Sequence, residues 1–181
     1  MAVKTYTWVS LWFLLTAPVI LWDAGYCFMR PRSMIGGDLH WFWEPYTIYQ
    51  KVHLLYGVLA LEKGEGFTNA QALMNVIETF LNFLYLYLAH FSEWPPAALI
   101  GLTSSALTLA KTILYYAQEY YCNYCTTGHN DWQTLVSYWI FPNVFWIIVP
   151  SFIIYVLGRD ICAQLTLADK AAEAVTADKK Q

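Results

Sequence analysis

Charged side chains are scarce in this sequence, and the scarcity excludes an ordinary soluble domain. Asp, Glu, Lys and Arg make up 13% of the 181 residues, compared with about 25% in typical soluble proteins. The net charge of −3 provides no basic surface, so no nucleic-acid partner is expected. The sequence also lacks an internal repeat and a glycine-rich nucleotide-binding motif, which argues against repeat architectures and the common nucleotide-binding folds.

Hydrophobic residues, by contrast, make up 58% of the chain and aromatic residues 18%, and the mean hydropathy is +0.38. Apolar runs of about 20 residues predict helices that cross a bilayer, because a rise of about 1.5 Å per residue must span about 30 Å of hydrocarbon. The sequence therefore predicts an all-α, polytopic membrane protein, a four-transmembrane-helix bundle that encloses a ligand cavity. The predicted helices are residues 7–29, 70–91, 96–121 and 134–158.

The remaining segments complete the predicted membrane topology. The first apolar run contains Pro18 and Asp23 and lacks a small-residue cleavage site, so we interpret it as a retained anchor and not a signal peptide. Residues 41–61 mix aromatic and charged side chains, which is typical of an interfacial or partly inserted helix. The polar tail, residues 159–181, is expected to be a frayed helix or disordered. Four crossings place both termini on one face, which we expect to be cytoplasmic.

Three of the four cysteines lie near predicted helix ends. Cys27 ends the first apolar run, and Cys122 and Cys125 form CNYC just after the third. A four-helix topology puts all three on one side of the membrane, where a disulfide from Cys27 to one of the other two is one possibility and free thiols are another. A metal site or a thioredoxin-like site needs a second ligand pair or a soluble fold. Only His129 is near, so no metal site is expected.

Polar side chains recur at helical spacing inside the predicted helices. Ionisable groups at membrane depth cost about 2.5–3.5 kcal/mol on insertion scales, so they usually face a bundle interior. Residues three or four positions apart share one face of a helix, and each predicted helix carries such a stripe. The stripes are Trp12, Thr16, Asp23 and Cys27; Asn75, Glu78, Thr79 and Asn82; Ser104, Thr108, Lys111, Thr112, Tyr115 and Glu119; and Trp139, Asn143, Trp146 and Pro150.

Two interpretations of these stripes are open. Ser, Thr and Asn hold membrane helices together at about 0.6 kcal/mol or more per contact, and Lys111 can pair with Glu78 or extend to the surface. A functional role is favoured for Glu78 and Asp23, because with Glu119 they exceed the charge that Lys111 can neutralise. A carboxyl group in a dry site can hold a proton and deliver it as a general acid. Indole faces attract cations, so Trp146 can stabilise a carbocation that such an acid creates.

Two short motifs resemble the emopamil-binding protein (EXPERA) superfamily. FPNVFWIIVPSFIIY in the fourth helix is similar to the last shared helix of that family, where an N-x-x-W pair precedes an apolar stretch with proline; here the pair is Asn143 and Trp146. NVIET in the second helix resembles the family's MET helix, and its glutamate is Glu78. The resemblance covers roughly residues 11–158 and implies a four-helix membrane domain, which we place at residues 7–158.

The resemblance implies a protein of the endoplasmic reticulum that handles sterols or other lipids. In the isomerases of the family an acid protonates a ring double bond, a tryptophan stabilises the cation, and a base removes a neighbouring proton. Carried over to this chain, Glu78 is one acid or base, Asn143 is a hydrogen-bonding partner, and Trp146 is the cation stabiliser. The isomerases also have an H-x-x-x-E pair in their first helix, where this chain has TAPVILWDAGY and Asp23 as a positional counterpart.

Two functions of different classes therefore follow. The first is a membrane-embedded isomerase or cyclase that acts, without a cofactor, on a hydrophobic substrate of sterol, terpenoid or polyketide type, in sterol or natural-product metabolism. The second is a non-catalytic sterol- or lipid-binding protein. The expected partners are the hydrophobic ligand, the lipid bilayer and a second copy in a homodimer. The predicted catalytic residues are Glu78, Asp23, Trp146 and Asn143, and the predicted substrate-binding residues are Asn75, Thr79, Asn82, Trp139, Lys111 and Tyr115.

One histidine in the interfacial segment has two interpretations. His53, in QKVHLLYG, is interpreted as an interfacial packing residue. A proton relay at the cavity mouth is the alternative, because imidazole titrates near neutral pH.

Overall fold

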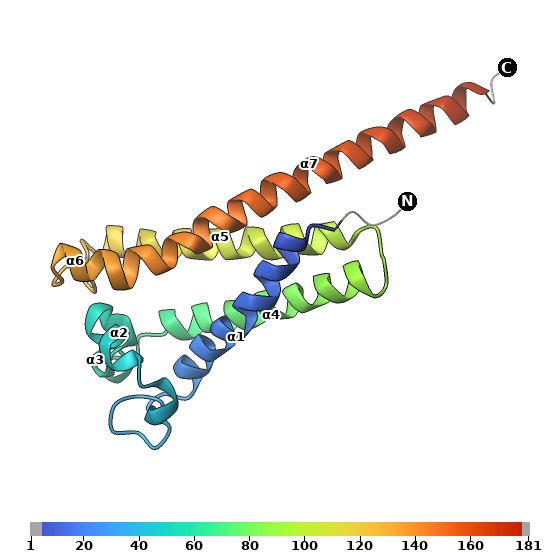
Figure 1. Ribbon diagram of the computed structural model, residues 1–181. Coiled ribbons are helices and arrows are strands. Elements are labelled where there is room, and N and C mark those ends of the chain that lie inside the picture. The colour runs from blue at the N-terminus through green and yellow to red at the C-terminus, as the bar shows by residue number, and fades with distance from the viewer. Residues whose placement is uncertain (1–4, 179–181) are drawn as a thin grey trace.

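A computed structural model of the protein describes residues 5–178, and four long helices dominate it (Figure 1). Each runs antiparallel to the one before, so the start of α1 and the end of α7 point to the same side of the bundle. In the part of the chain that the structure describes, four helical segments are long and apolar enough to cross a membrane. The fold is therefore the predicted all-helical polytopic bundle. The four helices are α1 (Thr7–Phe28), α4 (Phe67–His90), α5 (Ala97–Tyr121) and α7 (Phe141–Asp178).

The long helices pack in chain order. α1 packs on α4, α4 on α5, and α5 on α7. The predicted polar stripes do face inward, since Glu78, Asn82, Ser104 and Thr108 are all buried. Ser104 Oγ donates a 2.7 Å hydrogen bond to Asn82 Oδ1 and so joins α5 to α4. Part of the stripe thus holds helices together, as the structural interpretation predicted.

The end of the bundle where α1 begins is packed through a cluster of buried, mostly apolar side chains. Phe13 of α1 and Tyr85 of α4 make an edge-to-face contact with 5.2 Å between their ring centroids. Gly101 lets α5 approach this contact, because an added Cβ would lie 2.9 Å from Cδ2 of Tyr85. All four long helices contribute buried side chains to this end. The buried cluster comprises Val9, Phe13, Tyr85, Ala89, Ala97, Ile153 and Leu157.

The opposite end holds the connection between α1 and α4, which folds into short helices instead of the single interfacial helix expected at residues 41–61. Gly57 separates the last two of these helices in an extended conformation, which is one reason that no long helix forms. Their aromatic side chains pack inward with those of α1, α5 and the start of the last helical segment. The short helices are η1 (His40–Trp43), α2 (Tyr46–Val52), η2 (Leu54–Tyr56) and α3 (Val58–Glu62).

The last helical segment is longer than the predicted crossing. It begins with α6 (Trp132–Leu135) and a π-helical turn, η3 (Val136–Ile140), and α7 then continues to Asp178. The expected polar tail is thus a regular, exposed helix as far as the structure describes it. Good helix formers such as alanine account for this, because a helix that has already begun extends at little cost.

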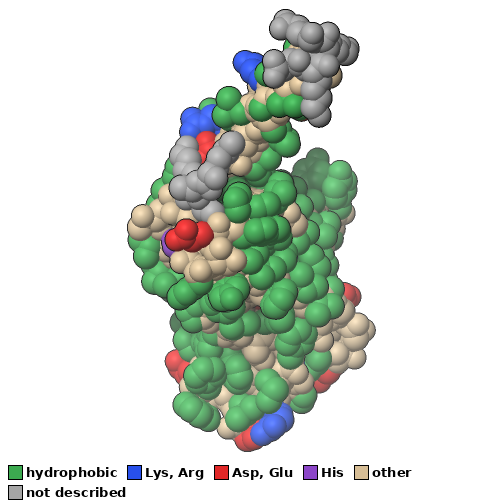
Figure 2. Space-filling model, turned by 90° about the vertical axis from the view of Figure 1, so that its right-hand side faces the viewer, with side chains coloured by type: hydrophobic (Ala, Val, Ile, Leu, Met, Phe, Trp, Pro, Cys, Tyr) green, Lys and Arg blue, Asp and Glu red, His purple; other side chains and the backbone are tan. Residues whose placement is uncertain are grey.

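The outer surface is hydrophobic, as a bilayer requires. Figure 2 shows hydrophobic side chains over most of one face, with few charged groups. Large apolar side chains are exposed on α1 and α4, among them Leu15, Val19 and Phe80. Lipid contact is the environment in which such a surface is stable.

Of the two alternatives left open for Cys27, a disulfide and a free thiol, the structure has the free thiol. Cys122 is joined to Cys125, with 5.4 Å between their Cα atoms, and Cys27 is a free, buried thiol. The chain turns back directly after α5, where Asn123 and Tyr124 both adopt left-handed backbone conformations with φ of 56°. This turn brings Cys125 beside Cys122, whereas Cys27 is enclosed by packed aromatic side chains.

Candidate active site

A cavity of about 430 Å³ lies between the long helices at the end that carries the short helices. Its volume falls in the range of small-molecule sites, roughly 300–1,000 Å³. Most of its wall is apolar or aromatic, with a few polar groups among them. The lining residues from α1 and α2 with its neighbours are Val19, Ile20, Trp22, Asp23, Pro45, Tyr46, Ile48, Tyr49 and Tyr56; those from the other helices are Gln71, Asn75, Lys111, Thr112, Tyr115, Tyr138, Pro142, Asn143 and Trp146.

The mouth of the cavity is marked by lining residues that are also exposed. Val19 of α1, Ile48 of α2 and Tyr138 of η3 are each about half exposed, at 53%, 51% and 46%. Two of these residues belong to segments that are long and apolar enough to cross a membrane. The cavity therefore opens along the side of the bundle.

Asp23 is the acidic group in the cavity wall. Tyr46 donates a 2.5 Å hydrogen bond to Oδ1 of Asp23, and the Asn75 amide donates a 3.2 Å hydrogen bond to Oδ2. Helix α1 positions Asp23, α2 positions Tyr46 and α4 positions Asn75. Three elements thus hold one carboxyl group against the cavity.

Lys111 connects this group to Glu78. The Lys111 ammonium donates a hydrogen bond to Oδ1 of Asn75 and lies 3.0 Å from Oε2 of Glu78. Thr108 donates a further hydrogen bond of 2.9 Å to the same Glu78 oxygen. Glu78 is completely buried and does not line the cavity, so Lys111 presents the charge of this pair to a ligand.

The remaining predicted residues divide between the cavity wall and the helix interfaces. Asn143 and Trp146 line the cavity, and Trp146 makes an edge-to-face contact with Trp12 at 5.7 Å between ring centroids. Asn82 bonds to α5, as described above, and Thr79 donates to the backbone carbonyl of Asn75 within its own helix. Six of the ten predicted site residues therefore share one cavity, and they are Asp23, Asn75, Lys111, Tyr115, Asn143 and Trp146.

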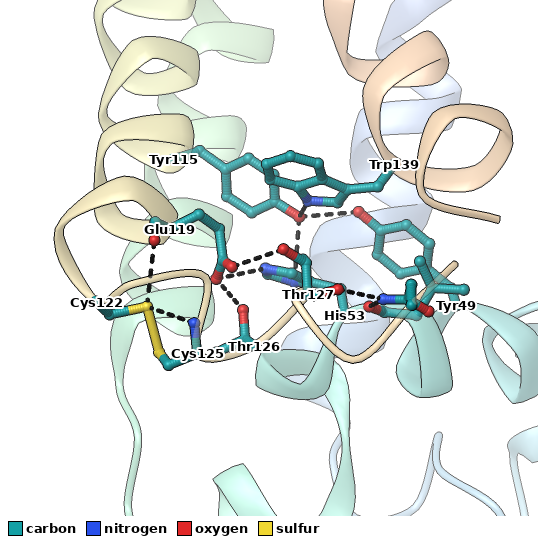
Figure 3. Close-up of polar contacts among 11 residues, drawn as sticks. Tyr49, His53, Tyr115, Glu119, Cys122, Cys125, Thr126, Thr127 and Trp139 are labelled. Carbon is teal, nitrogen blue, oxygen red and sulfur yellow. Dashed lines mark hydrogen bonds and ion pairs between the residues drawn. A yellow bond between two sulfur atoms is a disulfide. The ribbon is translucent and has the colours of Figure 1, made fainter. Parts of the chain in front are cut away.

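A second polar cluster lies beside the cavity, around His53 (Figure 3). The Tyr115 hydroxyl lies 3.1 Å from Nδ1 of His53 and 2.9 Å from the Tyr49 hydroxyl. The Trp139 indole donates a 3.1 Å hydrogen bond to the same Tyr115 oxygen. On the far side of the imidazole, Nε2 of His53 lies 3.6 Å from Oε1 of Glu119. Because Tyr49 and Tyr115 also line the cavity, the cluster connects the cavity to a buried carboxylate.

The environment alters the acid–base properties of two members of this cluster that lie outside the membrane-crossing helices. Burial lowers the pKa of His53 below its usual value, although the nearby Glu119 carboxylate opposes the shift. Burial raises the pKa of Tyr49 to about 12. The resting cluster thus has a neutral imidazole and a protonated phenol.

The loop after α5 holds Glu119 in place. Thr126 donates to Oε1 of Glu119, and Thr127 donates a 2.7 Å hydrogen bond to Oε2. The Glu119 carboxylate also lies near Cys122 and Cys125, with the ligand atoms of the three residues within 4.8 Å of one another. The two sulfur atoms are joined to each other and the carboxylate accepts from two threonines, so this arrangement does not present the free thiolates that a metal ion would bind.

Three tyrosines that line the cavity were not among the predicted site residues: Tyr46, Tyr49 and Tyr56. Tyr46 and Tyr49 are three positions apart, and Tyr49 and His53 are four apart, which places these three residues on one face of a helix. This spacing was a usable signal in the segment around residues 41–61. His53 is completely buried and lies 3.1 Å from the hydroxyl of Tyr115, a residue of the cavity wall.

Comparison with models of known protein families, with curated protein sequences and with solved structures finds no match to this chain. The function must therefore be inferred from the cavity and from the groups that line it.

Proposed function

We propose that this protein is a membrane-embedded isomerase or cyclase that acts by proton transfer on a hydrophobic ligand of sterol, terpenoid or polyketide type. The observation that carries the proposal is Asp23, a carboxyl group held by two hydrogen bonds in the wall of a largely apolar cavity. A cavity with an apolar wall and a few placed polar groups is the usual form of a small-molecule site. A lateral mouth suits a ligand that is dissolved in the bilayer.

The charge distribution makes Asp23 the proton donor in this proposal. Lys111 pairs with Glu78, whereas Asp23 accepts from the neutral groups of Tyr46 and Asn75. In a dry site one carboxylate can be balanced by one ammonium group, and the second carboxyl group is more stable with a proton. Asp23 then protonates a carbon–carbon double bond of the ligand, and a carbocation forms in the cavity.

Aromatic side chains provide the stabilisation that such a cation needs. Trp22, Tyr46 and Trp146 all line the cavity, and the face of an aromatic ring attracts a positive charge. Edge contacts with Trp12 hold Trp146 in one orientation. An enclosed wall of this kind also keeps water away from the cation, which water would quench. Loss of a proton from a neighbouring carbon completes an isomerisation or a cyclisation.

The sequence resemblance supports the same class of reaction. Asn143 and Trp146, which carry the resemblance to the EXPERA isomerases, both line the cavity. We extend the proposal to residence in the endoplasmic reticulum and to membership of that superfamily on this basis. Glu78 then acts through Lys111 and not by direct contact with the ligand.

A non-catalytic sterol- or lipid-binding protein is the second candidate. The observation that favours it is the extensive hydrogen bonding of Asp23 and Lys111, which would hold a polar or cationic headgroup without any chemistry. Both candidates need the same cavity. They differ in whether a carbon–hydrogen bond of the ligand is broken.

Turnover by matched variants distinguishes the two candidates. Wild-type protein, Asp23→Asn and Trp146→Ala are reconstituted with a Δ8-unsaturated sterol and, separately, with an epoxidised polyene, and the lipids are analysed by mass spectrometry after incubation in D₂O. We expect deuterium incorporation or an isomeric product with the wild type, and a loss of about 100-fold or more in both variants. Asp38→Asn is the control, because Asp38 forms an exposed ion pair with Arg32 away from the cavity.

Metabolite profiling after deletion of the gene extends the test to ligands outside these two probes. An accumulated precursor with an isomeric or uncyclised skeleton would support the enzyme. Bound lipid that is recovered unchanged from the wild type, together with an unaltered profile after deletion, would establish the binding protein instead.

A further inference from the structure

We propose that Tyr49, Tyr115 and His53 form a proton relay that accepts a proton from the ligand in the cavity. The inference deepens the proposed function, on which it rests, because it names the base that completes the reaction begun by Asp23. The relay starts at two hydroxyl groups of the cavity wall and ends beside a buried carboxylate (Figure 3). Its direction follows from the donors and acceptors themselves.

Two members of the cluster have a fixed hydrogen-bonding role. The indole nitrogen of Trp139 carries a hydrogen and can only donate, so the Tyr115 oxygen is its acceptor. The Glu119 carboxylate already accepts from the hydroxyl groups of Thr126 and Thr127. An ionised carboxylate can only accept. The hydrogen on the His53 imidazole is therefore best placed on Nε2, which faces Glu119 at 3.6 Å.

This assignment fixes the direction of the other hydrogen bonds in the relay. A neutral imidazole with its hydrogen on Nε2 has a bare Nδ1, which is an acceptor. The Tyr115 hydroxyl must then donate to Nδ1 of His53 across the 3.1 Å contact. Since the Tyr115 hydrogen is used in this way, the Tyr49 hydroxyl is the donor in the 2.9 Å contact between the two phenols. Every hydrogen points from the cavity toward His53.

Along the relay, each proton and electron pair that leaves one atom is received by another. A carbon–hydrogen bond next to the cation breaks, and its electron pair forms the new double bond of the product. The released proton binds the Tyr49 oxygen, the former Tyr49 proton passes to Tyr115, and the former Tyr115 proton passes to Nδ1 of His53. The ring becomes an imidazolium beside the Glu119 carboxylate. Return of this proton to Asp23 restores both groups before the next turnover.

The surroundings of His53 suit a group that gains a charge for a short time. The side chain is completely buried, and burial lowers its pKa, so the resting ring is neutral and able to accept. Glu119 is the charged group that faces it, and the titratable groups that face it are Tyr49, Tyr56 and Tyr115. Nε2 has no hydrogen-bond partner within normal distance among the described residues, so the Glu119 pair can shorten when the ring is protonated.

Nitrogen NMR of the full-length protein, with ¹⁵N-labelled histidine in lipid nanodiscs, tests the direction of the relay. The chain has four histidines, and His53→Gln assigns the signal of interest. At pH 7 we expect a protonated Nε2 and an unprotonated, hydrogen-bonded Nδ1. Tyr115→Phe should shift the Nδ1 signal toward that of a free ring nitrogen. Tyr116→Phe is the control, because Tyr116 bonds to the Ile140 carbonyl and should leave the His53 signals unchanged.

The opposite tautomer, or an imidazolium at pH 7, would overturn the relay, since neither can accept a proton from Tyr115. The tautomer of the wild type decides this point even if Tyr115→Phe fails to fold. The NMR result does not depend on turnover. Turnover with the opposite tautomer would overturn the relay and leave the proposed function standing, whereas the expected tautomer without turnover would count against the proposed function.

Turnover then tests whether the relay is used. With the ligand that gives product in the experiments above, His53→Gln should lower turnover by about 100-fold with little change in KM, because glutamine fills the space but its amide nitrogen is not basic enough to accept the proton from Tyr115. His129→Gln is the control. His129 lies on the exposed loop after α5, so this variant should retain wild-type turnover. Equal turnover by His53→Gln and the wild type would show that another group accepts the proton.

Discussion

The two ends of the bundle are built from the same four helices but are packed by different means. At the end near the termini, α1, α4, α5 and α7 meet through apolar and small side chains, with Gly101 allowing a close approach. At the other end, the short helices between α1 and α4 contribute to the wall of the cavity, where polar groups concentrate. The two ends thus differ in what they bury: apolar side chains at one end, and an ion pair beside an open cavity at the other.

The ion pair between Lys111 and Glu78 at the cavity end should give the largest change in stability. Lys111→Met leaves the buried Glu78 carboxylate without its cation, which should lower the free energy of unfolding by about 3–5 kcal/mol. Thermal unfolding in detergent, followed by tryptophan fluorescence, measures the loss. The double variant Lys111→Met with Glu78→Leu removes both charges and should recover most of it. A double variant as unstable as the single one would show that Lys111 stabilises through packing alone.

A core substitution at the closed end should give a somewhat smaller effect of a different kind. Ile153 is completely buried in the apolar cluster, and Ile153→Ala should cost about 2–4 kcal/mol of stability. The same unfolding assay measures it. Retained turnover per folded molecule would confirm that the closed end supports the site without taking part in it, and the exposed Ile148→Ala is the matched control.

The stability of the cavity end should also depend on pH through His53. Burial lowers the pKa of the folded-state imidazole, so the unfolded chain binds the proton more readily. The contribution of His53 is therefore complete above its unfolded pKa of about 6.5 and is lost as the pH falls below that value, with a slope of at most about 1.4 kcal/mol per pH unit. His53→Gln should flatten the difference between unfolding curves at pH 7 and pH 5. An identical pH dependence in that variant would assign the effect to another group.

The loop that holds Glu119 should give an effect smaller than those at Lys111 and Ile153. Thr127→Val removes one hydroxyl donor from the buried carboxylate and should lower stability by about 1–3 kcal/mol. Thr103→Val is the control, since Thr103 is exposed and bonds only within its own helix. A loss of turnover beyond the loss of folded protein would connect the position of Glu119 to the relay.

The long helices and their inner faces were predictable because membrane helices satisfy their own backbone groups and reveal themselves by length and hydropathy. The predicted and observed bounds of α4, residues 70–91 and Phe67–His90, differ by a few residues. Helical spacing also identified Asp23, Asn75 and Lys111 as inward-facing, and the structure places them together in one network. Organelle, ligand and dimer stay predictions.

The short helices were harder to predict, because their arrangement depends on contacts between segments far apart in the chain. Tyr46 reaches Asp23 across 23 positions, and His53 reaches Tyr115 across 62. The spacing of residues within one segment does not indicate such long-range contacts. The pairing of Cys122 with Cys125 has a local cause, the turn at Asn123 and Tyr124, which hydropathy does not encode.

The sequence by itself determined that this chain is a helical membrane protein with polar groups on its inner faces, since the bilayer leaves an apolar chain few other solutions. Only the tertiary structure decided which of those groups share a cavity. Glu78 lies behind Lys111, whereas Asp23 lines the cavity and is held by Tyr46. Helical spacing fixes the face on which a side chain lies, but the packing of neighbouring helices fixes what that face meets.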